Sequence, residues 1–229
     1  MFRSMLRAVL ALLLRLVFRP RISGLGNIPA SGPCIIAANH LSFCDHVLIS
    51  LMANRPVWFI GKAERLDGTG LRHRLRVKLL FTLGFVPVKR DGGAGGVDAL
   101  KRAEEVLREG RIFGIHPEGT RSPDGRVYRG RAGVGWLALA TGAPVIPCGL
   151  AGTDRVQPLG RLMWRVTRFD MHFGSPMTFP EFAGREGDYK VRRLVTDSVM
   201  EQVHTLAGLD YVHRYAPRST PAAEAIAGG

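Results

Sequence analysis

Short apolar runs alternate with stretches of helical periodicity along most of this chain. The runs are bounded by Gly, Pro or charged residues, which is typical of buried strands. A chain that alternates strands with helices forms an α/β domain, because each helix covers one face of the sheet. The pattern predicts strands near residues 33–38, 57–61, 85–88, 111–115, 144–149 and 165–174.

Two segments have the clearest helical pattern. Apolar side chains recur at intervals of three and four residues over 97–109, and Gly110 follows as a stop signal. A second helical pattern runs from about 188 to 206. We expect a single α/β domain over 21–215, with neither an internal repeat nor a second domain, because 229 residues can hold one sizeable core. The tail 216–229, rich in Ala, Pro and Gly, is expected to be flexible.

The first twenty residues form a separate segment rich in Leu and Val. Its longest uncharged run, 8–14, is too short for the ~20 apolar residues that span a bilayer. On a helix, its four arginines fall within an arc of about 160°, which is typical of an amphipathic helix that lies in the membrane interface. A signal peptide and a core helix are the alternatives, although no Ala-x-Ala-like cleavage site follows the run. The arginines are Arg3, Arg7, Arg15 and Arg19.

The charge of the chain also points to an anionic partner. Lys and Arg number 32 against 19 Asp and Glu, which gives a formal charge of +13. Anionic lipid and nucleic acid both fit such a charge. Residues 71–80 form a second basic, amphipathic pattern that suits a lipid surface or coenzyme A phosphates, although an ordinary surface helix fits it equally well. Because no zinc finger or RNP-like block is present, we expect no nucleic acid. The alternative from a different class is a basic peripheral membrane or nucleic-acid-binding protein without catalysis.

The sequence Asn-His-Leu-Ser-Phe-Cys-Asp at 39–45 carries the first candidate chemistry. Residues five apart on one helix point about 140° apart, so His40 and Asp45 need a strand, a turn and a new helix to meet. Asp45 suits the cap or first turn of an apolar stretch at 46–53. From there its carboxylate could hold one imidazole nitrogen of His40 and leave the other to take a proton. A helix-capping aspartate beside an ordinary loop histidine explains the same residues.

Cations follow a later strand. Lys89 and Arg90 end the run 85–88, and the glycine-rich 92–96 comes next. Cations at a strand end beside a flexible loop suit an anionic ligand, although a solvated strand end is an equally simple explanation.

A second candidate site follows the strand predicted at 111–115. The segment 116–122 reads His-Pro-Glu-Gly-Thr-Arg-Ser. Arg121 offers a planar fork of donors for phosphate, and Thr120 adds a hydroxyl. An internal ion pair between Glu118 and Arg121 that stiffens the turn is the structural alternative.

Other chemistries have weaker support. The chain has no Gly-x-Ser-x-Gly elbow, no Walker-type loop and no His-Glu-x-x-His sequence. His40, Cys44 and His46 lie close in sequence, but no second ligand cluster supports zinc, and we predict no metal. The three cysteines lack paired spacing, which favours a reducing compartment. A nucleophilic role for Cys44 is weaker than that of a small buried residue.

Four ordered blocks resemble the glycerolipid acyltransferases, in particular the 1-acyl-sn-glycerol-3-phosphate O-acyltransferase (lysophosphatidic acid acyltransferase) group. They are Asn-His-x-Ser-x-x-Asp at 39–45, Lys-Arg at 89–90, Pro-Glu-Gly-Thr-Arg-Ser at 117–122 and Val-Ile-Pro-Cys-Gly at 145–149. The resemblance covers roughly residues 21–175, and four motifs in order are far more specific than one. It implies the α/β glycerol-phosphate acyltransferase fold, with a mixed, mostly parallel-type sheet flanked by helices.

The resemblance also implies an activity in phospholipid biosynthesis. A fatty acyl group would move from an acyl-CoA or acyl carrier protein thioester to a hydroxyl of a glycerol phosphate lipid acceptor, foremost 1-acylglycerol 3-phosphate, giving phosphatidic acid. Glycerol 3-phosphate or another phosphorylated or glycosylated lipid is the alternative acceptor. His40 would be the general base and Asp45 its support, and no cofactor is expected. We expect a peripheral or monotopic protein on the cytoplasmic face of the cell membrane, bound to its anionic surface.

The substrate-binding roles come from the second and third blocks. In the family the second block binds the acceptor phosphate, which implies this role for Arg90 and, with a weaker match, for Lys89. The third block contributes further acceptor contacts, which fall here on Glu118, Gly119, Thr120 and Arg121.

Two positions depart from the family pattern. His116 stands where an aromatic residue commonly precedes Pro-Glu-Gly, and it could substitute in packing, add a hydrogen bond or titrate; packing is the first expectation. The lysine usual after the block is replaced by arginine, and the pattern leaves open whether Arg129 or Arg131 is its equivalent.

Overall fold

The computed structural model describes residues 2–62, 84–88, 95–161 and 163–217, and the single positions 70, 74 and 77. These residues form a seven-stranded sheet in the order β1-β8-β7-β2-β5-β3-β4 and a small pair of β6 with β9. The strands are β1 (Arg21–Ser23), β2 (Cys34–Ala38), β3 (Val57–Lys62), β4 (Phe85–Val88), β5 (Ile112–Ile115), β6 (Val127–Tyr128), β7 (Val145–Ala151), β8 (Asp170–Phe173) and β9 (Tyr211–Val212).

The large sheet is mixed and mostly parallel, as the family resemblance implied. Strands β7, β2, β5, β3 and β4 run parallel to one another, whereas β8 is antiparallel to β7, and β1 is parallel to β8. The carboxyl ends of β2, β5 and β7 therefore meet at one edge of the sheet. In open α/β sheets this is the edge at which ligands bind.

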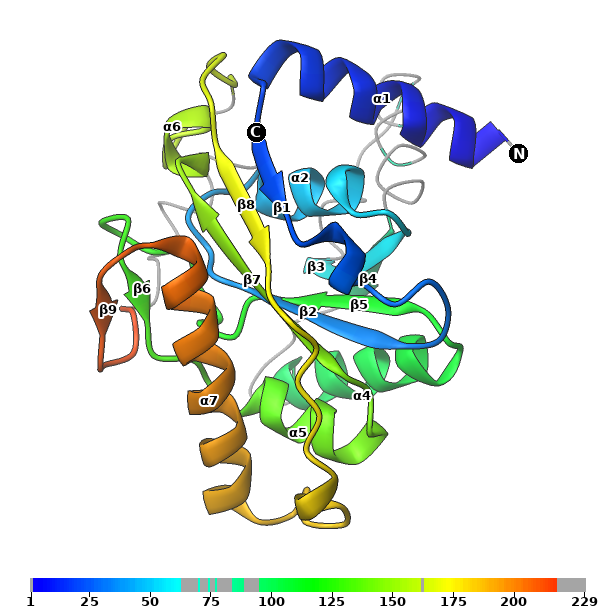
Figure 1. The fold of residues 1–229 in the computed structure, drawn as a ribbon, viewed down its shortest axis with the longest axis vertical. Helices are drawn as coiled ribbons and strands as arrows, with labels where there is room; N and C mark the ends of the chain where they lie inside the picture. The colour runs from blue at the N-terminus through cyan, green and yellow to red at the C-terminus, as the bar shows by residue number, and fades with distance from the viewer. Residues whose placement is uncertain are drawn as a thin grey trace.

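Helices cover both faces of the sheet (Figure 1). α1 and α2 lie on one side, and α4, α5 and α7 lie on the other. The short α6 follows β7. The helices are α1 (Phe2–Phe18), α2 (Asp45–Met52), α4 (Gly95–Arg108), α5 (Gly133–Thr141), α6 (Thr153–Val156) and α7 (Tyr189–Ala207).

The central strand β2 is apolar at every position because both of its faces are buried. Cys34, Ile36 and Ala38 pack into the core beneath α1 and α2. Ile35 and Ala37 pack into the core on the side of α4, α5 and α7. All five side chains are fully buried, because a strand covered on both faces has no polar side to present to water.

Several predicted elements differ from those of the structure. The strand expected at 165–174 is confined to β8, since residues 163–168 are mostly exposed and form no strand. The pattern did not indicate α5, whose 133–141 segment is apolar on all sides and lacks a helical period. The helices expected at 97–109 and 188–206 correspond to α4 and α7. The segment 71–80, apart from positions 74 and 77, and residues 218–229 of the tail lie outside the described residues.

The N-terminal segment is helical, but one of its arginines lies elsewhere than expected. The guanidinium of Arg7 turns toward the protein, and it donates hydrogen bonds to Ser50 O (3.0 Å) and Ala53 O at the end of α2. Burial lowers the pKa of Arg7, and this contact contradicts the expected headgroup position of that residue. None of the helices among the described residues combines the length and hydrophobicity needed to cross a membrane. The outer side of α1 exposes Met5, Val9, Leu12, Leu13, Leu16 and Val17.

Candidate active site

The end of β2 is fixed by the side chain of Asn39. Asn39 Nδ2 donates to Leu150 O at 2.9 Å, and Leu150 N donates back to Asn39 Oδ1 at 2.8 Å. The amide therefore continues the pairing of β2 with β7 for one more residue by side-chain bonds. Because Asn39 is fully buried, these bonds determine where His40 leaves the sheet. The local sequence around Asn39 does not indicate this role, since its partner lies 111 residues away.

His40 and Asp45 meet directly. His40 Nδ1 lies 2.9 Å from Asp45 Oδ2, and the same oxygen accepts the N–H groups of Leu41 and Ser42, each at 2.8 Å. Asp45 is the first residue of α2 and Cys44 is its N-cap, so the carboxylate turns back to the preceding turn instead of capping its own helix. The strand, turn and helix thus bring His40 and Asp45 together, as predicted.

The protonation state of Asp45 follows from these contacts. Burial by itself raises the pKa of Asp45, but the hydrogen bond and charge of His40 and the Ser42 N–H lower it below its usual range. The ionised carboxylate can only accept, so the His40 proton lies on Nδ1. The lone pair of Nε2 is then available, and the His40 side chain is 18% exposed, which leaves it accessible to a substrate.

His116 combines the packing and hydrogen-bonding roles that the sequence left open. Its ring stacks on His40 at 4.0 Å between centroids, with an interplanar angle of 8°, and Phe59 stacks on it at 5.5 Å. Nδ1 lies 3.1 Å from Ala38 O and 3.0 Å from Asn39 O, and since carbonyls only accept, Nδ1 carries the proton. Burial and the nearby His40 lower the pKa of His116 to about 3, so its ring is neutral at physiological pH.

Glu118 contacts the backbone of the first block. Its side chain is fully buried, and its Oε1 accepts the His40 N–H at 3.4 Å. Burial raises the pKa of Glu118 to about 9, so it is a neutral acid near pH 7. The proposed ion pair with Arg121 is absent among the described residues. Ser122 N donates to His40 O at 2.7 Å, so the third block holds His40 on both sides of its backbone.

The remaining residues of the third block form a turn beside His40. Gly119 has φ +72°, and a Cβ at this position would lie 3.1 Å from the side chain of Arg131. Thr120 Oγ1 is buried and has no hydrogen-bond partner in the described part of the chain. The guanidinium of Arg121, half-buried on the same turn, makes no ion pair or hydrogen bond with described residues. These groups remain candidates for contacts with a ligand, whereas Lys89 and Arg90 lie outside the described residues.

The structure distinguishes the two arginines that follow the third block. Arg129 forms an ion pair with Asp197, in which Nη2 lies 3.0 Å from Oδ2. The side chain of Arg131 packs against Gly119, and its guanidinium carbon lies 5.2 Å from the ring centroid of Tyr215. Arg131 has no carboxylate partner among the described residues. Arg131 is therefore the arginine positioned beside the third block.

Cys44, between His40 and His46 in the sequence, is a structural residue. Cys44 is buried and its Sγ lies 3.4 Å from Ser42 Oγ, and burial together with Asp45 raises the pKa of its thiol to about 12. A thiol with so high a pKa is a poor nucleophile at neutral pH. In the described ranges no group of three or more His, Cys, Asp or Glu side chains is arranged to hold a metal ion.

A mostly parallel α/β sheet that carries a His–carboxylate pair next to a Pro-Glu-Gly-Thr-Arg turn fits the class of acyl-transferring enzymes that the sequence blocks resemble. The model of the Acyltransferase family matches residues 19–151. The chain belongs to this acyltransferase family.

Relatives and a solved structure extend this result. The chain is 37% identical over 146 residues to the chloroplastic 1-acyl-sn-glycerol-3-phosphate acyltransferase BAT2 of Brassica napus, a match that covers 62% of this chain and 40% of that protein. It is 30% identical to the 1-acyl-sn-glycerol-3-phosphate acyltransferase of Borreliella burgdorferi, over 58% of this chain and 51% of that one. The chain thus spans about half the length of these relatives, or less.

The crystal structure of the 1-acyl-sn-glycerophosphate acyltransferase PlsC from Thermotoga maritima has the same fold. The TM-score is 0.62 at 26% identity, and the match covers 89% of this chain and 83% of that chain.

The buried acid Glu118 gives a pH-dependent prediction. Between its usual pKa of 4.5 and its folded value of about 9, the unfolded chain releases this proton while the folded chain keeps it. The contribution of Glu118 to stability is complete below 4.5 and is lost as pH rises toward 9. Between these two pH values, this group lowers the free energy of unfolding by about 1.4 kcal/mol per pH unit. Glu118→Gln should flatten the pH dependence of the free energy of unfolding by this amount, measured by denaturant titration from pH 5 to 8.

The exposed Glu181 supplies the control for this measurement. Glu181→Gln should leave the slope of the parent protein unchanged. An equal slope for Glu118→Gln and the parent would show that Glu118 is ionised in the folded protein and would contradict the assignment.

Proposed function

We propose that this protein transfers a fatty acyl group from a thioester to a hydroxyl of 1-acylglycerol 3-phosphate, forming phosphatidic acid. The observation that carries the proposal is the His40–Asp45 hydrogen bond, which leaves His40 Nε2 free on an accessible imidazole. Membership of the acyltransferase family and the activity for which the relatives are named support the substrate class.

The reaction moves one proton through His40 Nε2, from the acceptor hydroxyl to the departing sulfur. As the acceptor hydroxyl oxygen attacks the thioester carbonyl, Nε2 takes its proton and Asp45 stabilises the resulting imidazolium. The C–S bond then breaks, and the proton passes from His40 to the departing sulfur, which leaves as a thiol. The acceptor itself is the nucleophile, so neither an acyl-enzyme nor a cofactor is required.

Charge around the turn supports binding of the acceptor phosphate. Arg121 and Arg131 have no carboxylate partners in the described part of the chain, and guanidinium groups bind phosphate through paired N–H donors. We assign them to the acceptor phosphate, together with Lys89 and Arg90. Glu118 and Gly119 support this site indirectly, since one holds the His40 backbone and the other accommodates Arg131.

The N-terminal helix supports a membrane location. Six large apolar side chains of α1 are exposed along its outer side, while Arg7, Leu10 and Leu14 face the protein. We propose that this apolar face lies in the membrane interface, where a lipid acceptor is found. The basic surface suits the anionic lipid and an anionic donor, either acyl-CoA or acyl carrier protein.

The experiment that tests this function measures thiol release from acyl-CoA with 1-acylglycerol 3-phosphate, 2-acylglycerol 3-phosphate, glycerol 3-phosphate or no acceptor. Release should require 1-acylglycerol 3-phosphate, and His40→Ala should lower kcat by about 10²- to 10⁴-fold, because general base catalysis is lost. The matched control is His213→Ala, which changes a histidine near the C-terminal end.

Other outcomes are equally informative. Release that needs no acceptor would identify a thioesterase and contradict the proposal. A preference for glycerol 3-phosphate would retain acyl transfer but reject the lipid acceptor. Turnover of folded His40→Ala at the parent rate would exclude His40 as the base.

A second prediction concerns the acceptor phosphate. Arg121→Gln should raise KM for 1-acylglycerol 3-phosphate by about 10- to 100-fold, since hydrogen bonds to a charged group are lost. The KM for acyl-CoA should change much less, as measured by steady-state kinetics with each substrate varied.

Arg126 provides a matched control on the same loop. Its guanidinium is already bonded to Asp124, with Nη2 at 2.6 Å from Oδ2. Arg126→Gln should leave the KM for the acceptor close to the parent value. An unchanged acceptor KM for Arg121→Gln would remove Arg121 from the phosphate site.

A further inference from the structure

A loop far from α1 in sequence carries highly exposed large apolar side chains. The segment 158–168, which we call the 158–168 loop, joins α6 to β8. Met163 is 81% exposed and Val166 is 72% exposed, more than any other large apolar side chain among the described residues, those of α1 included. Leu159 is exposed on the same loop. Three large apolar side chains exposed within eight residues suit an interaction surface.

The charge around these side chains is uniformly positive. Arg155, Arg161, Arg165 and Arg168 are all exposed, and no acidic residue occurs between 155 and 169. None of the four guanidinium groups forms an ion pair or a hydrogen bond in the described part of the chain. Apolar tips interspersed with arginines suit an anionic bilayer, because the tips can enter the acyl region while the guanidinium groups bind headgroups.

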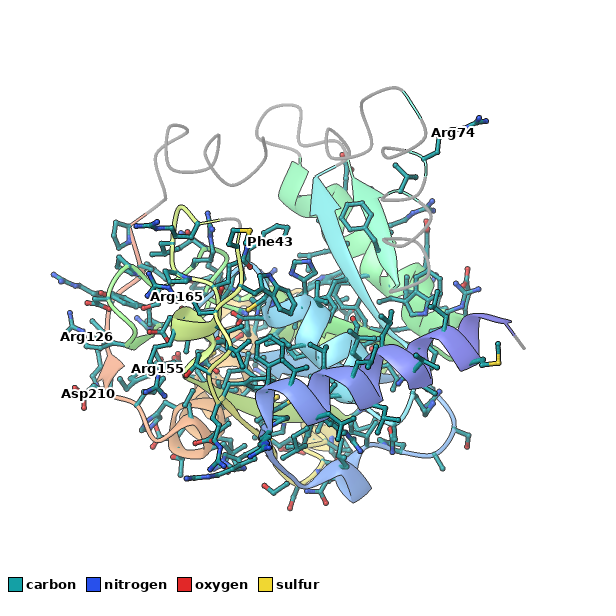
Figure 2. All side chains as sticks on the ribbon, turned by 90° about the horizontal axis from the view of Figure 1, so that it is seen from above. Phe43, Arg74, Arg126, Arg155, Arg165 and Asp210 are labelled. Atoms are coloured by element: carbon teal, nitrogen blue, oxygen red, sulfur yellow. The ribbon has the colours of Figure 1, made fainter. Side chains whose placement is uncertain are left out.

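The loop is continuous with the end of α1. Trp164 packs edge-on against Phe18, the last residue of α1, with ring centroids 5.9 Å apart and an interplanar angle of 71°. The loop and α1 lie at the same end of the molecule (Figure 1). Figure 2 views this end from above, with α1 lying across the molecule and Arg155 and Arg165 to one side of it. Arg15 and Arg19, at the same end of α1 as Phe18, are also exposed.

Hydrogen bonds connect the loop to the His40 turn. Ser42 Oγ donates to Gln157 O at 2.6 Å, immediately before the loop. The loop then folds back, with Gln157 Nε2 donating to Arg161 O at 3.1 Å and Arg165 N donating to Val156 O at 2.7 Å. The other end of the turn leads into α2, which is held to α1 through Arg7. The active-site turn is therefore connected to both surface elements.

We propose that the 158–168 loop is a second membrane-binding element, which inserts Met163 and Val166 into an anionic bilayer beside α1. The proposal rests on the membrane association proposed above. Two attachments, one on each side of the His40–Asp45 turn, hold the active site at the lipid surface. An acidic acyl carrier protein would match the arginines, but the apolar tips and their continuity with α1 favour the bilayer.

The test places a fluorescent label on the loop. Because Cys34, Cys44 and Cys148 are all buried, a nitrobenzoxadiazole reagent will label an added surface cysteine selectively. The probe positions are Met163→Cys and, as matched control, Leu194→Cys on α7, whose side chain is also exposed. Each labelled full-length protein is mixed with phosphatidylcholine vesicles with or without phosphatidylglycerol, and sedimentation is measured in parallel.

The label at 163 should shift to the blue and gain intensity with the anionic vesicles, while the label at 194 should not change. Met163→Asp/Val166→Asp should weaken vesicle binding by about tenfold or more, since two apolar side chains lose their burial in lipid. Leu194→Asp should bind as the parent does. A thermal unfolding midpoint close to the parent value would establish that each variant is folded.

Three outcomes would overturn the proposal. Sedimentation with vesicles without a response at 163 would leave α1 as the membrane-binding element alone. A response at 163 to acyl carrier protein but not to vesicles would assign the loop to a protein partner. Failure of the parent protein to bind vesicles would reject membrane association as well, whereas the acyl-transfer proposal is tested separately by thiol release.

Discussion

One carboxylate oxygen, Oδ2 of Asp45, organises the active-site turn. It accepts hydrogen bonds from the imidazole of His40 and from the N–H groups of Leu41 and Ser42, all within 2.9 Å. The same interaction closes the turn, fixes the imidazole proton on Nδ1 and presents Nε2 outward. Fold and chemistry depend on it together, because the carboxylate is fully buried and ionised only while these donors surround it.

The neighbouring buried groups keep this charge isolated. His116 is neutral because burial and His40 lower its pKa, and Glu118 is neutral because burial raises its pKa. Both still make bonds to the backbone around His40, at Ala38 and Asn39 for His116 and at His40 itself for Glu118. The fixed charge of Asp45 thus acts on one imidazole, and the backbone that carries this imidazole has little freedom to move.

Much of this arrangement could be predicted from local sequence, and the limits have physical causes. Strand β2 and helix α4 follow from apolar runs and periodicity, and the meeting of His40 with Asp45 requires only five residues. Helix α5 lacked a periodic pattern because it is buried on nearly all sides and contains Gly133 and Gly135.

Contacts between segments distant in the sequence could not be predicted from local patterns. The stacking of His116 on His40 depends on the parallel pairing of β2 with β5, which brings residues 76 positions apart into contact. The choice of Arg131 over Arg129 depends on Asp197 in α7, which a local motif does not include. For α1 the helix was predicted, but the inward direction of Arg7 depends on the free carbonyl groups at the end of α2.

The central claim is that Asp45 promotes acyl transfer by acting through His40. A double-mutant cycle of kcat with Asp45→Asn, His40→Ala and the combined variant tests it most directly. Asp45→Asn should lower kcat by about 10²-fold or more in the parent protein, because the imidazole loses its orientation and its stabilising charge. In the His40→Ala background the same change should have almost no further effect. An equal loss in both backgrounds would mean that Asp45 acts independently of His40, and it would contradict the account.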